Sequence, residues 1–313
     1  MSAAGQTPVP EFVRIAPEAD AALAAGRAVV AFETTILSFG LPQPLNAEVA
    51  AGCEDAARRH GAVPATLAIL DGTVRVGLAP DEAAFFCSRH PDIRKVNLQN
   101  LAGVLASGRP GALTVAASLR ACALAGIRVF ATGGIGGVHR GFPSPPDVSG
   151  DLPALARFPV ATVCAGAKSI LDVPATLEAL ETLGVPVAGF GTRTFPLFHA
   201  RGSAHALEDV FDEVGPLADL VRARLALGDG GVLVANPVPE ADAIDPAELE
   251  CWIAEALESA AGAGVSGKKV TPFLLERLEA LSGGRTLRAN RALVLNNADL
   301  AARLAVALAD GGR

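Results

Sequence analysis

Short apolar runs alternate with longer segments of helical periodicity along most of the chain. Runs rich in β-branched and other apolar residues predict strands at residues 28–32, 66–70, 74–76, 128–131, 160–164, 185–190 and 231–235. Between them, apolar residues recur at spacings of three and four, which predicts helices at residues 46–60, 112–125, 169–183, 216–227, 246–261, 271–281 and 296–309. This alternation is typical of an α/β fold with helices on both faces of a sheet.

Residues 132–151 form the longest stretch without a periodic pattern. The stretch contains His139, Arg140, Asp147 and Asp151 among glycines and prolines. Irregular segments of this length inside a compact domain usually carry function, so we expect chemistry there. No repeat or long linker divides the chain. We therefore interpret residues 1–10 as a loose tail and residues 11–313 as a single α/β domain.

Composition narrows the classes of partner. Half of the 313 residues are hydrophobic, the formal net charge is -7, and the chain has one Trp and no Tyr. A nucleic-acid surface needs clustered cations and usually aromatic side chains for stacking, so we expect no nucleic-acid partner. A phosphorylated metabolite remains compatible with this charge, because a few cations in one pocket outweigh the average surface.

Cysteine spacing and the apolar pattern indicate a compartment. The five cysteines show neither a CxxC pair nor zinc-ligand spacing, which predicts reduced thiols. The first ten residues lack the basic and apolar regions of a signal peptide. Arginines and glycines interrupt apolar stretches such as residues 113–138, so we predict no membrane segment and a cytoplasmic location.

Two glycine-rich segments imitate nucleotide-binding motifs. TGGIGGVHRG, from Thr132, follows a predicted strand, but it fits no GxGxxG register and prolines follow where a helix is needed. GAGVSGKK, from Gly262, ends in Lys where a P-loop needs a Ser or Thr for magnesium, and it follows a helix. Neither segment supports a dinucleotide or ATP site.

Lys168 follows an apolar run and a turn of small residues, Ala165-Gly166-Ala167. Burial among such neighbours disfavours a charged ammonium, and nucleophilic attack requires a neutral amine, so Lys168 is a Schiff-base candidate. The alternative is a lysine at the start of a helix whose amine reaches solvent.

Three further positions carry candidate groups, each with a structural alternative. Glu33 follows the apolar run 28–32, where burial would raise its pKa enough for acid or base chemistry near neutrality; a hydrogen-bonded structural carboxylate is the alternative. Lys95, beside Arg94, offers a cation for a phosphate, although adjacent basic residues often decorate a solvated turn. The segment Asp147-Val-Ser-Gly-Asp151 has oxygen ligands suited to Mg²⁺ or Mn²⁺, or forms an Asx turn or helix cap.

Together these segments resemble the pseudouridine-5'-phosphate glycosidase family, also called the indigoidine synthase A-like family, over nearly the whole chain. The motifs that carry the resemblance are AFETTILSFGLP with NAEVA, RKVN, GALTVAAS, VFATGGIGGVHRG, DVSGDLPALARFPVATVCAGAKSILD, GFGTRTFPLF, GKKVTPFLLERL and TLRANRALVLNNADLAARLA. Because so many motifs follow one another in the same order, coincidence is a poor explanation.

The resemblance implies a three-layer α/β/α sandwich around a mixed sheet, a homotrimer, and reversible cleavage of pseudouridine 5'-phosphate to uracil and ribose 5-phosphate through a lysine Schiff base. It implies Mn²⁺, with Mg²⁺ or another divalent ion as a substitute. The roles it carries over are Lys168 as nucleophile, Glu33 as proton donor, Asp147 as metal ligand, and Lys95, the Val115 backbone, Ser149, Gly150 and Asp151 as substrate-binding residues. Gly150 departs from the alanine common in the family but removes no functional group.

Two other functions remain open at this stage. One is a different lyase or aldolase that acts on a phosphosugar through Lys168. The other is a catalytically silent phosphosugar-binding or pigment-pathway accessory protein, against which the joint presence of Glu33, Lys95, Asp147 and Lys168 argues.

Overall fold

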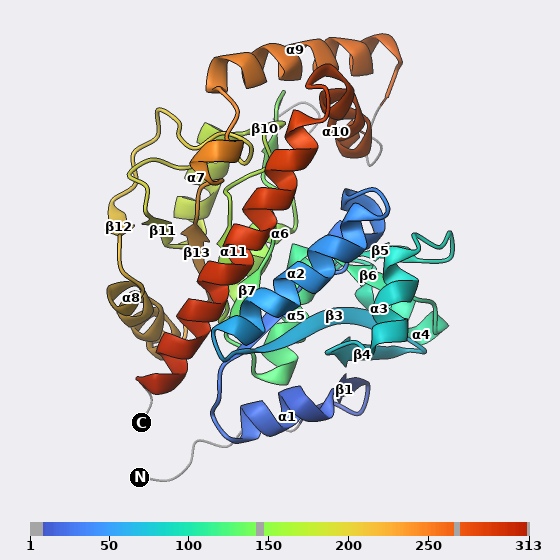
Figure 1. The fold of residues 1–313 in the computed structure, drawn as a ribbon, viewed down its shortest axis with the longest axis vertical. Coiled ribbons are helices and arrows are strands. Elements are labelled where there is room, and N and C mark those ends of the chain that lie inside the picture. Colours follow the sequence, from blue (N-terminus) through green and yellow to red (C-terminus); the bar gives the residue numbers. More distant parts are fainter. Residues whose placement is uncertain (1–8, 142–146, 266–269, 312–313) are drawn as a thin grey trace.

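The computed structural model describes residues 9–141, 147–265 and 270–311, and it has the three-layer α/β arrangement expected from the sequence (Figure 1). Within these residues, eleven strands form one mixed sheet. Its main path runs, in spatial order, through β1 (Val13–Ile15), β4 (Thr73–Val76), β3 (Val63–Leu70), β2 (Val29–Phe32), β7 (Val129–Ala131), β9 (Ala161–Cys164), β13 (Val232–Ala235), β11 (Val187–Phe190) and β12 (Asp209–Phe211).

The sheet is parallel from β3 to β12 and antiparallel where β4 and β6 (Gly111–Leu113) pair with β3. β5 (Arg94–Val96) lies parallel to β6, and a separate ribbon pairs β8 (Val138–His139) with β10 (Leu171–Asp172). Because the central strands are parallel, the loops that follow them meet at one edge of the sheet. In open α/β sheets this edge is where ligands bind.

Helices cover both faces of the sheet. α2 (Leu45–Arg59) and α11 (Arg285–Asp310) cross one face side by side, and α5 (Val115–Ala125) packs with α6 (Asp151–Arg157) on the other (Figure 1). The remaining helices are α1 (Pro17–Ala24), η1 (Ile36–Gly40), α3 (Pro80–Cys87), α4 (Leu101–Ser107), α7 (Val173–Thr182), α8 (Val214–Leu227), η2 (Glu240–Asp242), α9 (Pro246–Gly262) and α10 (Val270–Leu281).

α11 is long and apolar enough to cross a membrane if only length and composition are considered. Half of its most apolar window is buried, and the helix contacts β2, β7 and β9 directly. Leu293, Ala298 and Leu304 belong to the central hydrophobic cluster. Its apolar face is therefore part of the protein core.

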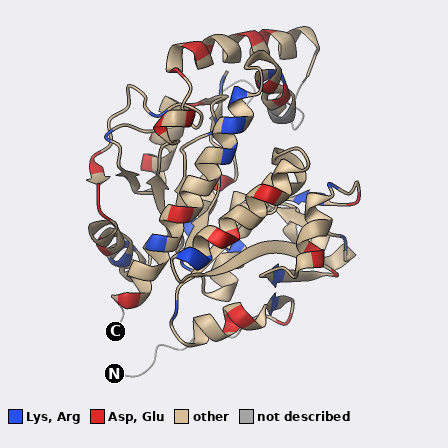
Figure 2. Ribbon diagram, viewed as in Figure 1, with Lys and Arg blue, Asp and Glu red and all other residues tan. Residues whose placement is uncertain are grey.

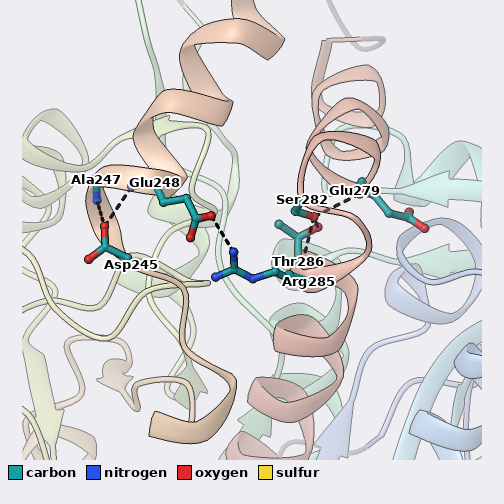
Figure 3. A network of polar contacts seen from close by, with 7 residues as sticks. All are labelled: Asp245, Ala247, Glu248, Glu279, Ser282, Arg285 and Thr286. Carbon is teal, nitrogen blue, oxygen red and sulfur yellow. Dashed lines mark hydrogen bonds and ion pairs between the residues drawn. The ribbon is translucent and has the colours of Figure 1, made fainter.

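A polar network joins α9 to the start of α11 (Figure 3). Asp245 caps α9 by accepting hydrogen bonds from the backbone N–H groups of Ala247 and Glu248, at 2.9 and 3.0 Å. The Glu248 carboxylate then forms an ion pair with Arg285, whose guanidinium also lies 5.2 Å from the centre of the Trp252 ring. These contacts fix the helix that crosses the end of the molecule in Figure 1.

Three predicted helices begin elsewhere. In segment 112–125, residues 111–113 form β6 instead, and the helix begins at Val115. In segment 169–183, the helix begins only at Val173, because the Asp172 side chain caps it by accepting from Ala175 N. In contrast, α11 begins at Arg285, well before the predicted residue 296, since polar residues interrupt the apolar pattern of its first turns.

Candidate functional site

Glu33 lies directly after β2, at the edge of the sheet where the parallel strands end. Its side chain is buried, with 9% of the residue exposed, and it accepts a short hydrogen bond from the Thr132 hydroxyl, which directly follows the neighbouring strand β7. Burial raises the pKa of Glu33, while the Lys168 charge and the Thr132 hydrogen bond act in the opposite direction. The environment therefore favours the protonated acid.

The backbone around Glu33 is held from two sides. The Thr34 hydroxyl donates to Leu67 O of β3 at 2.8 Å and accepts from Leu113 N of β6 at 3.0 Å. The chain then enters a π-helical turn, η1, a rare conformation that is frequent at functional sites. A small cavity of about 20 Å³ with mostly apolar walls lies against Glu33, which explains the poor solvation of its carboxyl group.

Lys168 lies four residues beyond β9, the strand next to β7. The turn before it is tied to the loop after β7, because Ala165 N donates to Gly133 O at 2.9 Å and Lys168 N donates to Ile135 O at 3.1 Å. Gly166 in this turn has a φ of +89°, and a Cβ placed there would lie 2.2 Å from Pro196 O. The loops carrying Glu33 and Lys168 are thus joined through the Thr132–Ile135 segment.

Lys95 lies on β5, where residues 94–96 pair with β6, so this segment is a strand and not the turn considered as the alternative. Partial burial of its ammonium group and the charge on Lys168 lower the pKa of Lys95, and Glu33 and Asp151 oppose this effect. Lys95 as a residue is exposed. These mutual effects place Lys95, Lys168, Glu33 and Asp151 in one neighbourhood.

Asp151 opens α6 and binds backbone N–H groups from two other segments. Its carboxylate accepts from Ala116 N, in the first turn of α5, at 3.0 Å and from Gly136 N at 2.8 Å. Ser149 Oγ accepts a hydrogen bond from Asp151 N at 3.2 Å, while Gly150 is exposed and has no neighbour that would obstruct a Cβ. Asp151 therefore fastens residues 149–151 against the start of α5.

Val115 is the first residue of α5. Its side chain is buried, and Thr114, which precedes it, makes no side-chain cap. In the part of the chain that the structure describes, the Thr114 hydroxyl is buried without a hydrogen-bond partner. The Asp151 carboxylate binds the Ala116 N–H of this turn, and the neighbouring Val115 N–H suits an anion or a carbonyl oxygen.

Asp147 lies further out than these residues, with 51% of its side chain exposed. Its carboxylate is 3.9 Å from His139 Nδ1, and its carbonyl accepts from His139 N at 3.0 Å. Across the described ranges, no three His, Cys, Asp or Glu side chains are grouped as a metal cluster. A single exposed carboxylate fits a largely hydrated Mg²⁺ or Mn²⁺ and does not fit a zinc site built from several side chains.

A cavity of about 690 Å³ lies beside the Lys168 turn, between the β10 segment and α9. Its walls are mostly apolar, and Arg140, the cation in them, is paired with Glu250 at 2.5 Å. Of the residues described, Ser169 lines this cavity but Lys168 does not. The size of the cavity therefore does not identify it as the reaction site.

The sequence patterns did not indicate two residues that support the site, Thr132 and Asn297. Thr132 was hidden in the glycine-rich segment that imitates a dinucleotide motif, although its place directly after a strand, like that of Glu33, was a usable signal. Asn297 of α11 donates from Nδ2 to Thr132 O at 2.8 Å and Gly133 O at 3.3 Å. Helical spacing alone could not reveal this contact, which spans 165 residues of sequence.

Comparison with known proteins gives one consistent result. The family model described as indigoidine synthase A-like protein matches residues 18–307. A protein of Methylobacterium nodulans called pseudouridine-5'-phosphate glycosidase is 51% identical over 294 residues, which is 94% of this chain and 87% of the relative. A protein of the same name from Alkaliphilus metalliredigens is 47% identical over 301 residues, covering 96% and 98% of the two chains.

Two solved structures share the fold. The prealnumycin C-glycosynthase AlnA, crystallised with ribulose 5-phosphate, superposes with a TM-score of 0.90 at 37% identity, covering 97% of this chain and 99% of AlnA. An indigoidine synthase A-like protein from Thermotoga maritima superposes with a TM-score of 0.85 at 35% identity, covering 95% and 97%.

Proposed function

This chain belongs to the indigoidine synthase A-like family, and we propose that it is a pseudouridine-5'-phosphate glycosidase, which reversibly cleaves the C-glycosidic bond to give uracil and ribose 5-phosphate. The observation that carries the proposal is the identity of 46–51% over nearly the full chain with relatives of that name. The grouping of Glu33, Lys95, Lys168 and Asp151 supports it, because it supplies an acid, a nucleophile and an anion-binding cation.

The first step needs an acid. The bond between C1' and uracil C5 joins two carbons, so protonation of a heteroatom leaving group cannot break it directly. Protonation of the ring oxygen by Glu33 lets the C1'–O4' bond break while the N1 lone pair of uracil forms an exocyclic double bond from C5 to C1'. The buried Glu33, whose environment favours the protonated form, suits this role.

The second step needs an amine. Lys168 Nζ adds to C1' of the opened sugar, and uracil C5 gains a proton. The nitrogen lone pair then forms the imine as the C1'–C5 bond breaks, and uracil leaves with that bond's electron pair. Water hydrolyses the imine and releases ribose 5-phosphate and the free amine. The shared anchoring of the Glu33 and Lys168 loops supports a common site of action.

The residues around Glu33 and Lys168 bind the substrate in this proposal. Lys95 supplies a positive charge for the 5'-phosphate, and the Val115 N–H at the start of α5 supplies a donor. The neighbouring segment Ser149-Gly150-Asp151 also binds the substrate in this proposal. The hydrogen bonds that Asp151 accepts from Ala116 N and Gly136 N hold this segment in place. If Lys95 contributes binding energy through the phosphate, unphosphorylated pseudouridine should be a much poorer substrate.

We propose that Asp147 binds Mn²⁺, with Mg²⁺ or another divalent ion as a substitute, through its carboxylate and water molecules. When bound there, the ion would supply positive charge and ordered water molecules to the loop that carries Asp147. Activity should fall after exhaustive chelation and return with Mn²⁺ but poorly with Zn²⁺. Asp147→Asn should need a higher Mn²⁺ concentration for half-maximal activity, and full activity of the chelated protein would contradict the assignment.

The decisive assay supplies purified protein with pseudouridine 5'-phosphate and Mn²⁺ and follows uracil by chromatography. Release of uracil with intact ribose 5-phosphate supports the proposal. Cleavage of the sugar backbone would indicate the rival phosphosugar lyase, and binding without turnover would indicate an accessory protein. The similarity to a C-glycosynthase makes the reverse reaction, from uracil and ribose 5-phosphate, a necessary second measurement.

Two broader properties are also proposals. We propose a homotrimer, for which light scattering should return about three times the chain mass of 31.7 kDa. We also propose a cytoplasmic location, supported by five free cysteines, four of them buried, none of which requires an oxidising compartment.

A further inference from the structure

A buried pair of asparagines connects the ends of three neighbouring strands to α11. Asn297 Nδ2 donates to Thr132 O and Gly133 O, after β7, and Asn297 Oδ1 accepts from Asn236 Nδ2, after β13, at 3.0 Å. Asn236 N in turn donates to Cys164 O, at the end of β9, at 2.8 Å. Both asparagines are almost fully buried.

The two carbonyl groups that Asn297 binds belong to the segment that joins the proposed acid to the proposed nucleophile. Thr132 donates its hydroxyl to Glu33, and Gly133 O also accepts from Ala165 N in the turn before Lys168. α11 packs closely on this segment: a Cβ on Gly133 would lie 3.2 Å from Val294 Cγ2. A shift of this segment would therefore move both groups at once.

We propose that Asn297 is a positioning residue that holds the Thr132–Glu33 pair and the Lys168 turn in their reactive arrangement, an inference that rests on the function proposed above. An amide suits this position because it donates two hydrogen bonds to carbonyl groups and accepts one from Asn236. A buried helix side chain needed only for packing would be apolar, since burying a polar group is unfavourable unless all its hydrogen bonds form.

The test replaces Asn297 with Leu, which keeps a similar size but removes every hydrogen bond. We expect kcat to fall by about 10- to 100-fold, as when a supporting residue lets catalytic groups shift, with little change in KM. The neighbouring Asn296 is a matched control, because it also binds a backbone carbonyl, Pro237 O at 3.1 Å, but away from Thr132 and Glu33. Asn296→Leu should keep kcat close to the wild-type value.

A second measurement separates positioning from general destabilisation. The hydrogen bond from Thr132 lowers the pKa of Glu33, so its loss in Thr132→Val should move the Glu33 titration to higher pH. Asn297→Leu should move it in the same direction, and Asn296→Leu should not. Infrared difference spectra against Glu33→Gln report this titration without substrate, so the inference can be judged even if the proposed reaction is wrong.

The combined variant Thr132→Val/Asn297→Leu should lose less kcat than the two separate losses multiplied together, because both act on one hydrogen bond. If Asn297→Leu does not fold, Asn236→Leu takes its place and should shift the titration in the same direction. An unshifted Glu33 titration in whichever of these variants folds would overturn the proposal, as would an equal shift in Asn296→Leu.

Discussion

Glu33 and Lys168 are opposite charges close enough to influence each other, and each must lose its charge for the proposed chemistry. The acid must carry a proton to open the sugar ring, and the amine must be free of one to attack C1'. The apolar cavity beside Glu33 disfavours its carboxylate, because low polarity disfavours a charged group, and this contributes to the raised pKa of Glu33.

At Lys168 we predict covalent trapping. Borohydride added during turnover should reduce the imine to a secondary amine and add the mass of a reduced ribose phosphate to the peptide containing Lys168. Lys168→Arg keeps the positive charge but remains protonated, so it should give no adduct and at most a trace of uracil. Mass mapping of the adduct is the measurement. An adduct on Lys95, or near-normal turnover by Lys168→Arg, would contradict the role of Lys168.

At Glu33 we predict a slow but stable variant. Glu33→Gln keeps the shape and loses the proton, so kcat should fall by about 100- to 10,000-fold with substrate binding retained. The raised pKa means that Glu33 favours the folded state at low pH and that this stabilisation is lost as pH rises through its folded pKa. Gln has no such loss, so the variant should denature no more easily than wild type in alkaline urea titrations. A kcat loss matched by lost stability would indicate a structural role.

The sequence predicted individual candidate residues better than it predicted which residues those candidates contact. Glu33 and Lys168 could be proposed because each follows an apolar run, and strand ends are readable from such runs. That Thr132 would bond to Glu33 depends on β2 lying beside β7, which is a matter of strand order. The proximity of Lys95 to the other site residues likewise depends on β5 pairing with β6. The sequence pattern did not predict β6, because it assigned residues 112–125 to a helix.

Among the elements, the turn between β9 and Lys168 has little freedom to vary, because Gly166 has a positive φ and lies close to Pro196 O. Gly166→Ala should cost at least about 1–2 kcal/mol for its left-handed backbone alone, before the clash with Pro196 O, and should also lower kcat by displacing Lys168. Gly150→Ala is the matched control, because Gly150 has a φ of −64° and open space for a methyl group. Urea unfolding and uracil release measure both effects. Equal stability of the two variants would refute this account of the turn.

The elements themselves were predictable where one physical signal dominated. All seven predicted strands exist. The runs of β2, β3, β7, β9 and β13 are buried almost throughout, as expected for central strands of a mostly parallel sheet, whereas β4 alternates between buried and half-buried residues. The short strands β1, β5, β6, β8, β10 and β12 were not predicted, since two or three residues carry no period. The first turns of α11 were also missed, because the half-buried Arg285 and the exposed Arg288 and Arg291 interrupt the apolar pattern. Figure 2 marks the positions of basic residues in blue along this part of the helix.

At the scale of the whole molecule, α11 packs on the central strands of the sheet and also contacts the loop after β7, which is part of the proposed site. It packs beside α2 across the strands that carry Glu33 and Lys168, and its first turn is fixed to α9 by Arg285 (Figures 1 and 3). Its buried Asn297 then reaches the strand ends. One helix from the end of the chain thus contributes both to the core and to the arrangement of the loops, so changes in α11 at the residue that contacts these loops, Asn297, should affect stability and turnover together.

The last prediction concerns how the stability of the whole fold depends on pH. His199 is buried against Phe198 and Ser169, and burial lowers its pKa to about 3, whereas an unfolded chain has the ordinary value of 6.5. Between these values the unfolded state binds a proton that the folded state does not, so His199 stabilises the fold above pH 6.5 and this stabilisation is lost as pH falls. The loss is about 1.4 kcal/mol for each pH unit in that window. His199→Gln changes the contacts with Phe198 and Ser169, so it should be less stable than wild type at pH 7.5. Because Gln cannot titrate, the variant should lose stability less steeply between pH 6 and pH 4 in urea titrations. Parallel pH profiles for the two proteins would show that His199 is not held neutral in the folded state.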